Sequence, residues 1–147
     1  MKKTLYYFFI VAFLMIGCSE DDGPVELANE APEEQSCGAT SDLIGQSRAL
    51  RVSNTYGISG TVTILSDCEV EISNFFYNGL GPNVSIYGGV NGDFVNGVNL
   101  TSPINGIVFE DETIRFFLPE GSTVDEINSF SVWCFEFDID FSSASFQ

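Results

Sequence analysis

Apolar and polar residues alternate along much of the chain from residue 37 onward. The alternation is clearest in the segment 68–73, where Cys68, Val70 and Ile72 fall on one side and two glutamates and a serine fall on the other. A period of two predicts a β-strand with one face buried. Strands are predicted in the same way at 60–65, 83–87, 104–109, 113–118 and 131–141.

The segments between these strands carry turn signals. The dipeptide Asn-Gly, which favours tight turns with positive φ, occurs at 78–79, 91–92, 96–97 and 105–106. Short strands separated by such turns predict an all-β domain, an antiparallel sandwich or barrel. The one helical signal is the capping-box pattern Thr123–Glu126, which predicts a single turn or two.

The last predicted strand, 131–141, has an aromatic stripe on one face. The stripe consists of Trp133, Phe135, Phe137, Ile139 and Phe141. Burial of each ring contributes roughly 2–3 kcal/mol, so this face is predicted to lie in the core. The opposite face carries Cys134, Glu136, Asp138 and Asp140, so the thiol is expected to point away from the main stripe unless a bulge shifts the register. A buried or semi-buried free thiol beside Trp133 is the preferred interpretation of Cys134.

The amino-terminal segment has the pattern of an export signal. Lys2 and Lys3 precede an apolar stretch at 5–16, which is too short to span a bilayer. The run Met15–Cys18 resembles the lipobox of bacterial lipoproteins. This resemblance implies cleavage after residue 17 and a lipid on Cys18. The expected location is the outer membrane, at the cell surface or facing the periplasm.

Residues 18–36 are expected to form a disordered acidic linker. Pro24 and Pro32 interrupt helix formation, and the apolar content is too low for a folded core. Two interpretations of this linker remain open. It is either a solvated spacer or a surface-export signal, because an acidic run directly after a lipid-carrying cysteine resembles such a signal. The folded domain is then 37–147.

Composition excludes several classes of function. The net charge is −16, there is no histidine, and cleavage after residue 17 would remove both lysines and both methionines. A nucleic-acid partner is excluded because phosphate binding depends on Lys and Arg, so the membrane is expected to be reached only through the lipid. Catalysis by Ser-His or Cys-His pairs is excluded, and no zinc-type metal site is expected.

Carboxylate chemistry survives this exclusion, with Glu136, Asp138 and Asp140 and the run 110–112 as candidates. A glycosidase or a calcium site needs a defined geometry that spacing does not show, and a solvated acidic face is the preferred interpretation. The residues therefore do not point to an enzyme.

Three motifs resemble a known family. They are Asn74–Asn83, Leu118–Gly121 and Phe130–Cys134, with the opening strand at 60–62 and a closing segment at Phe141. Over 56–147 they resemble the Skeletor-type electron-transfer domain, the "DM thirteen" family. That family is similar to the DOMON domains, which are β-sandwiches that can carry haem. The resemblance implies a DOMON-like sandwich with redox activity at Cys134, beside Trp133.

Haem itself is disfavoured, because only cysteine and tyrosine would remain as axial ligands once both methionines are removed. The cofactor therefore stays undefined. A lone thiol also cannot cycle as a dithiol, so a redox role needs a partner thiol, a cofactor or a diffusing oxidant.

With Cys18 lipidated, three cysteines remain and three pairings are open. If Cys134 is the family's lone cysteine, the resemblance implies a disulfide between Cys37 and Cys68.

The alternative function is a non-enzymatic adhesion or ligand-binding module. Its candidate binding residues are Tyr77, Asn78, Gly79, Gly81 and Pro82. Aromatic side chains at strand spacing are more often core residues than a binding platform.

Overall fold

The structure, a computed structural model, describes residues 25–26 and 36–147. The predicted signal segment 1–17, the expected lipid site Cys18 and most of the predicted linker lie outside the described residues. Within the described ranges, no helix is long and apolar enough to cross a membrane.

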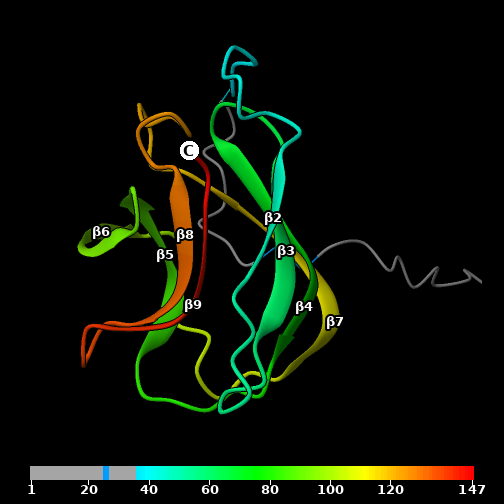
Figure 1. Ribbon diagram of the computed structural model, residues 1–147, viewed down its shortest axis with the longest axis vertical. Coiled ribbons are helices and arrows are strands. Elements are labelled where there is room, and N and C mark those ends of the chain that lie inside the picture. The colour runs from blue at the N-terminus through cyan, green and yellow to red at the C-terminus, as the bar shows by residue number, and fades with distance from the viewer. Residues whose placement is uncertain (1–24, 27–35) are drawn as a thin grey trace, which may run out of the picture.

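Two β-sheets face each other, one on each side of Figure 1. The first sheet has the strand order β1-β7-β4-β3-β2, formed by Val25–Glu26, Phe109–Phe117, Glu69–Tyr77, Ser59–Ile64 and Ser47–Ala49. The second has the order β6-β5-β8-β9, formed by Asp93–Asn99, Val84–Val90, Ser129–Cys134 and Ile139–Ser145. All pairings are antiparallel except that of β1 with β7. The predicted all-β sandwich is confirmed.

The core lies between the sheets and follows the alternation of the strands. Val70 and Ile72 of β4 are 0% and 1% exposed, as their period of two predicts. Ile86 of β5 and Val132 of β8 are fully buried members of the same core. The predicted strands at 60–65, 68–73, 83–87 and 113–118 correspond to β3, β4, β5 and the second half of β7.

The Asn-Gly turns are confirmed at the β5–β6 hairpin, where Asn91 and Gly92 have φ of 52° and 84°. The prediction is wrong at Asn96-Gly97, which lies inside β6. A Cβ on Gly97 would be 2.4 Å from the Gly88 carbonyl oxygen, so glycine is needed there for close strand packing rather than for a turn.

The predicted strand 131–141 is wrong, because the chain reverses at 135–138 and returns as β9. Asp138 takes φ of 53° in this hairpin. Phe135 and Phe137 are 39% and 60% exposed and do not continue a core stripe.

The strand predicted at 104–109 is also wrong. Residues 104–108 form a loop, and β7 begins only at Phe109. Ile104 is buried, so its side chain packs into the core from a loop rather than from a strand. At Thr123 a single turn forms, in which the backbone N–H of Thr123 donates to the Glu126 carboxylate at 3.0 Å, and the capping-box prediction is confirmed.

Candidate functional site

Cys134 is the last residue of β8, and its thiol is completely buried. It shares the inward face of β8 with Phe130 and Val132, so the expected buried free thiol is confirmed, whereas the expectation that it points away from the core stripe is wrong. The predicted row of carboxylates beside it is wrong as well, because Glu136 and Asp138 lie in the hairpin turn that follows β8. The thiol instead donates a hydrogen bond to the carbonyl oxygen of Pro82, with 3.0 Å between Sγ and O.

The loop 78–83 covers Cys134 and contains four of the five predicted ligand-binding residues, Asn78, Gly79, Gly81 and Pro82. Gly79 and Gly81 take φ of 76° and 118°, where a side chain is strained. A Cβ on Gly81 would lie 2.8 Å from the ring of Phe141, so glycine lets the loop pack on this ring. The side-chain oxygen of Asn78 accepts a hydrogen bond from the Leu80 N–H at 3.0 Å, and its side-chain amide donates to the carbonyl oxygen of Thr55 at 3.4 Å.

Tyr77 lies inside the same cluster at the end of β4. Its hydroxyl is buried and donates to the carbonyl oxygen of Leu80 at 2.7 Å. Burial, followed by the charges of Cys134 and Tyr56, raises the pKa of Tyr77 to about 12. The phenol therefore stays neutral at physiological pH, and the structure brings Tyr77 and the loop 78–83 together with Cys134.

Tyr56 and Phe141 complete the cluster. The sequence predicts Phe141 as a core residue, and it is 5% exposed, whereas Tyr56 was missed. Their rings stack with 3.7 Å between centroids and an interplanar angle of 8°. Tyr56 also accepts a hydrogen bond from the Asn78 N–H through its carbonyl oxygen at 3.1 Å. Tyr56 stands in an irregular segment without alternation, and no sequence signal marks it.

Trp133 is separated from Cys134, although the two are neighbours in sequence. Successive side chains of a strand point to opposite faces, so Trp133 lies on the outer face of the second sheet. There its ring packs against Phe94 and Tyr87, at 5.7 and 6.3 Å between centroids. The aromatic ring and the thiol thus belong to two different clusters.

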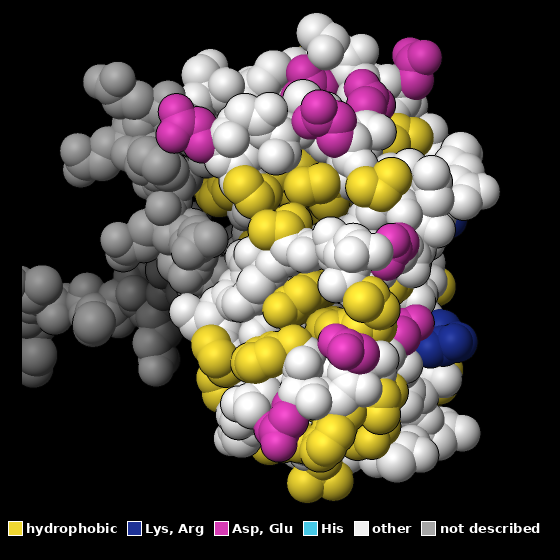
Figure 2. Space-filling model, turned by 90° about the vertical axis from the view of Figure 1, so that its left-hand side faces the viewer, with side chains coloured by type: hydrophobic (Ala, Val, Ile, Leu, Met, Phe, Trp, Pro, Cys, Tyr) yellow, Lys and Arg dark blue, Asp and Glu magenta, His cyan; other side chains and the backbone are white. Residues whose placement is uncertain are grey.

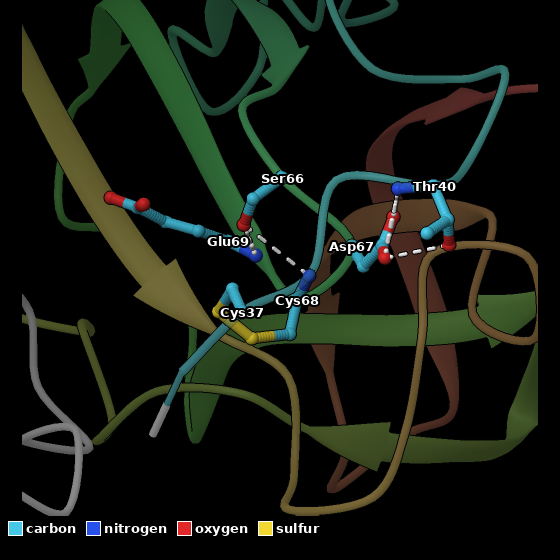
Figure 3. The surroundings of a disulfide bond; sticks show 6 residues. All are labelled: Cys37, Thr40, Ser66, Asp67, Cys68 and Glu69. Carbon is cyan, nitrogen blue, oxygen red and sulfur yellow. Dashed lines mark hydrogen bonds between the residues drawn. A yellow bond between two sulfur atoms is a disulfide. The ribbon is translucent and has the colours of Figure 1, made fainter. Parts of the chain in front are cut away.

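A disulfide joins Cys37 and Cys68, the pairing that the family resemblance implied (Figure 3). It leaves Cys134 as the free cysteine of the described residues. The bridge ties the beginning of the domain to the residue preceding β4. Both cysteines line a surface cavity of about 400 Å³, together with Asp67 and the loop 120–123.

Asp67 reinforces this attachment. Its carboxylate accepts hydrogen bonds from the backbone N–H groups of Thr40 at 2.9 Å and Ser41 at 2.8 Å (the Thr40 bond is drawn in Figure 3). The N–H of Ser41 is the main cause of a lowered pKa of Asp67. Disulfide and carboxylate together hold the segment 37–41 against the sandwich, at the end away from Cys134.

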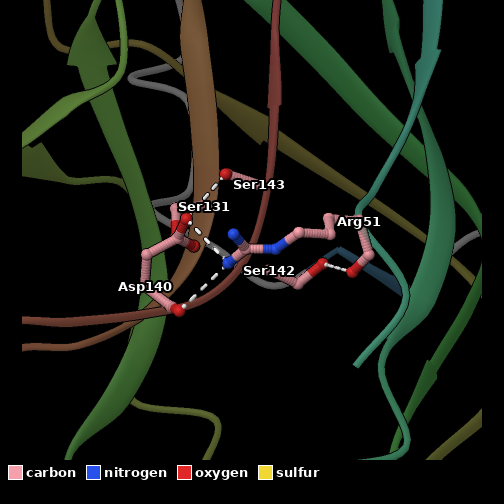
Figure 4. A network of polar contacts seen from close by, with 5 residues as sticks. All are labelled: Arg51, Ser131, Asp140, Ser142 and Ser143. Carbon is pink, nitrogen blue, oxygen red and sulfur yellow. Dashed lines mark hydrogen bonds and ion pairs between the residues drawn. The ribbon is translucent and has the colours of Figure 1, made fainter. Parts of the chain in front are cut away.

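Asp140 forms a second polar network where β9 meets the segment that follows β2 (Figure 4). Its carboxylate accepts hydrogen bonds from the hydroxyls of Ser131 and Ser143, each at 2.7 Å, and pairs with Arg51 at 3.1 Å. The Ser142 hydroxyl donates to the carbonyl oxygen of Arg51. Asp140 therefore closes one side of the sandwich instead of belonging to a free acidic face.

The residues do not fit a haem. The chain has no histidine, and its two methionines lie outside the described residues. The Cys134 thiol and the Tyr77 hydroxyl, which could serve as axial ligands, are each hydrogen-bonded to a loop carbonyl. The rings of the other two described tyrosines, Tyr56 and Tyr87, pack against Phe141 and Trp133. A second cavity, of about 340 Å³, is lined by the glycines of β5 and β6 and by Pro119, Ser122 and Ile127, and none of these is a haem ligand. No group of His, Cys, Asp and Glu among the described residues is arranged to hold a metal ion.

Comparison with known proteins identifies one family. The family model described as "Electron transfer DM13" matches residues 50–146. Two curated proteins of Drosophila melanogaster, Protein Skeletor isoforms B/C and Protein Skeletor isoforms D/E, are each 30% identical over 97 residues, which is 61% of this chain. The chain spans 12% of the first relative and 6% of the second, so the similarity concerns one domain of much longer proteins. No solved structure matches the chain.

Proposed function

The chain belongs to the DM13 family of electron-transfer domains, and on this premise we propose that it is a redox domain in which Cys134 is the group that is oxidised and reduced. The observation that carries the proposal is the position of this thiol. It is the free cysteine of the described residues, and the loop that covers it belongs to the segment through which the chain resembles the family. Cys37, by contrast, lies outside the matched residues 50–146.

A single thiol needs an external reaction partner. With a peroxide, the thiol sulfur attacks one oxygen, the O–O bond breaks, and the products are a sulfenic acid and water or an alcohol, so two electrons leave the sulfur. A second thiol then condenses with the sulfenic acid to a disulfide and water, and a further thiol restores Cys134. Because the thiol is buried and bonded to Pro82, the loop 78–83 must open for each of these steps.

The test compares the native protein with the Cys134→Ser variant. The native protein is expected to consume one equivalent of hydrogen peroxide and to bind a sulfenic-acid probe at Cys134, with recovery after a thiol is added. The variant should do neither. An absorption spectrum of protein purified from its native membrane is recorded in parallel, together with a free-thiol count. A colourless protein in which native chain and variant behave alike would overturn the redox role.

We further propose that the protein is a bacterial lipoprotein of the outer membrane, at the cell surface, held by a lipid on Cys18. The support is the lipobox-like run Met15–Cys18 after the basic and apolar stretch, followed by an acidic segment. Intact-mass analysis of protein from the native membrane is expected to find an acylated Cys18 as the first residue. An amino terminus that still contains Lys2 and Lys3 would contradict this anchor.

A second candidate is a non-enzymatic adhesion or ligand-binding module. The complete burial of Cys134 favours it, because reactive cysteines are usually partly exposed. The loop 78–83 would then contribute to a binding surface, as the exposed side chain of Leu80 suggests. This candidate predicts a ligand whose affinity is the same for the native protein and for Cys134→Ser.

A further inference from the structure

One end of the sandwich carries a group of exposed apolar side chains. Six of the ten exposed large hydrophobic side chains in the described part of the chain belong to it, with exposed fractions from 39% to 60%. We call this group the apolar end, and it consists of Leu80, Ile107, Val108, Phe135, Phe137 and Ile139. These residues come from the loop 78–83, the loop 105–108 and the β8–β9 hairpin.

Backbone hydrogen bonds bring these three segments together. The N–H of Gly106 donates to the carbonyl oxygen of Gly79 at 2.8 Å, which joins the two loops. The N–H of Phe135 donates to the carbonyl oxygen of Asn83 at 3.2 Å, and the Asn83 side chain donates to the Glu136 carboxylate at 2.6 Å. The apolar side chains therefore share one end of the fold, and hydrophobic surface is visible in the lower half of Figure 2.

The apolar end is not required to complete the core. The residues beneath it, Tyr77 and Phe109, are already buried, so the exposed side chains add apolar surface on the outside. The ring of Phe135 is supported from one side by Tyr87, with 6.3 Å between centroids and an interplanar angle of 21°. Contiguous exposed apolar surface of this kind marks interaction sites in soluble domains.

The charges around the apolar end restrict what can bind there. Glu110, Glu136 and Asp138 are exposed at its margin, and the nearby Arg51 is paired with Asp140. With a net charge of −16, the chain repels a second copy of itself and anionic lipid headgroups. A partner with an apolar centre surrounded by lysines or arginines would complement both the apolar side chains and the carboxylates at their margin.

We propose that the apolar end is a docking surface for a basic protein partner. The apolar side chains of that partner contact Leu80, Ile107 and the β8–β9 hairpin, and its cationic side chains face the three carboxylates at the margin. The apolar end includes Leu80 of the loop 78–83, which covers Cys134, but docking requires neither a free thiol nor electron transfer. The proposal is therefore independent of the redox role.

The test uses the purified protein and two synthetic peptides with Leu, Phe and Trp in the middle. One peptide has lysines at both ends, and in the other every lysine is replaced by glutamate. The lysine peptide is expected to bind and to shift the NMR amide signals of 79–80, 106–108 and 135–138. The variant Leu80→Ser/Phe137→Ser should bind it about tenfold more weakly, since loss of two apolar anchors costs at least this much.

The matched control is Val95→Ser, because Val95 is 66% exposed but lies on β6, away from the apolar end. This variant, like Cys134→Ser, should bind the lysine peptide as the native protein does. Equal binding of the glutamate peptide, no binding of the lysine peptide, or equal weakening by Val95→Ser would overturn the proposal. Two further outcomes would overturn the proposal. One is a dimer in sedimentation that Leu80→Ser/Phe137→Ser abolishes, because the occupant would then be a second copy of the chain. The other is binding to phosphatidylglycerol vesicles that the same variant abolishes, because the occupant would then be a lipid.

Discussion

Removal of the Cys37–Cys68 disulfide provides the sharpest test of how the domain is held together. The bridge joins residues separated by 31 positions. For a loop of this length the chain-entropy relation gives about 3.7 kcal/mol of stabilisation, because the cross-link restricts the unfolded chain. In a domain of this size that loss lowers the midpoint of thermal unfolding by roughly 10–15 °C.

The perturbation is the double variant Cys37→Ser/Cys68→Ser, measured by guanidinium and thermal unfolding against the native protein. The folded state should survive, because the Asp67 carboxylate still holds the backbone of Thr40 and Ser41. Reduction of the native protein with dithiothreitol should give the same loss of stability as the double substitution.

The control is Cys134→Ser, in which the serine hydroxyl can still donate to Pro82, so a cost of only about 1 kcal/mol is expected. A free energy of unfolding of the double variant within about 1 kcal/mol of the native value would show that the disulfide contributes little to stability. The prediction also fails if Cys134→Ser is the more damaging change.

Three further predictions concern pH and loop packing. The pKa of Tyr77 is raised from 10.0 to about 12, so the unfolded chain ionises first and stability falls as the pH rises above 10. The free energy of unfolding is expected to fall by an amount on the order of 2–3 kcal/mol once the pH exceeds 12. In Tyr77→Phe the guanidinium midpoint should change less between about pH 9 and pH 11.5. The pKa of Asp67 is lowered from 3.8, so the carboxylate stabilises the folded state above that pH, and this stabilisation is lost as the pH falls below it. The unfolding midpoint of Asp67→Asn should therefore depend less on pH in the acidic range below 3.8. Gly81→Ala should lower the free energy of unfolding by about 2–4 kcal/mol, because its Cβ would lie 2.8 Å from the Phe141 ring. Gly106→Ala, at φ of 82° with nothing within 4 Å of the Cβ, should lower it by only about 1 kcal/mol. Both values are measured by chemical denaturation, and equal losses would show that contact with Phe141 does not matter.

The sheets could be predicted where one face of a strand is buried and the other is polar. β4 is such a strand, since Val70 and Ile72 alternate with glutamates that lie on the outer side. Alternation failed at the β8–β9 hairpin, because Phe135 and Phe137 continue the period of two through a turn that contains neither Gly nor Pro. This error also placed Cys134 on the wrong face, since the direction of its side chain was taken from the supposed stripe.

Short and fully exposed strands left no pattern to find. β2 has three residues, all exposed, and was not predicted. β6 was missed because one Asn-Gly pair precedes it and a second lies inside it, and a turn was expected where Gly97 packs against a neighbouring strand. β1 falls inside the segment expected to be an unstructured linker, where two residues pair with β7.

The candidate site was predictable in part. The motif at 74–83 and Cys134 were both recognised in the sequence, and the structure places them in contact. Alternation alone places Trp133 and Cys134 on opposite faces of the predicted strand, and the structure keeps them apart. The sequence assigned the inward direction to the wrong face, because the face of Cys134, with Phe130 and Val132, is the one that lies in the core. Tyr56 and Phe141 reach the site through long-range packing, which no local pattern encodes.

The most direct test of the redox role is a titration of Cys134 itself. Protein purified from its native source is treated with stoichiometric peroxide, and the oxidation state of each cysteine is determined by peptide mass spectrometry before and after a thiol is added. We expect reversible oxidation at Cys134, with Cys37 and Cys68 unchanged in their disulfide. A Cys134 thiol that stays reduced while the protein still transfers electrons, or that is already joined to another cysteine, would contradict the redox role.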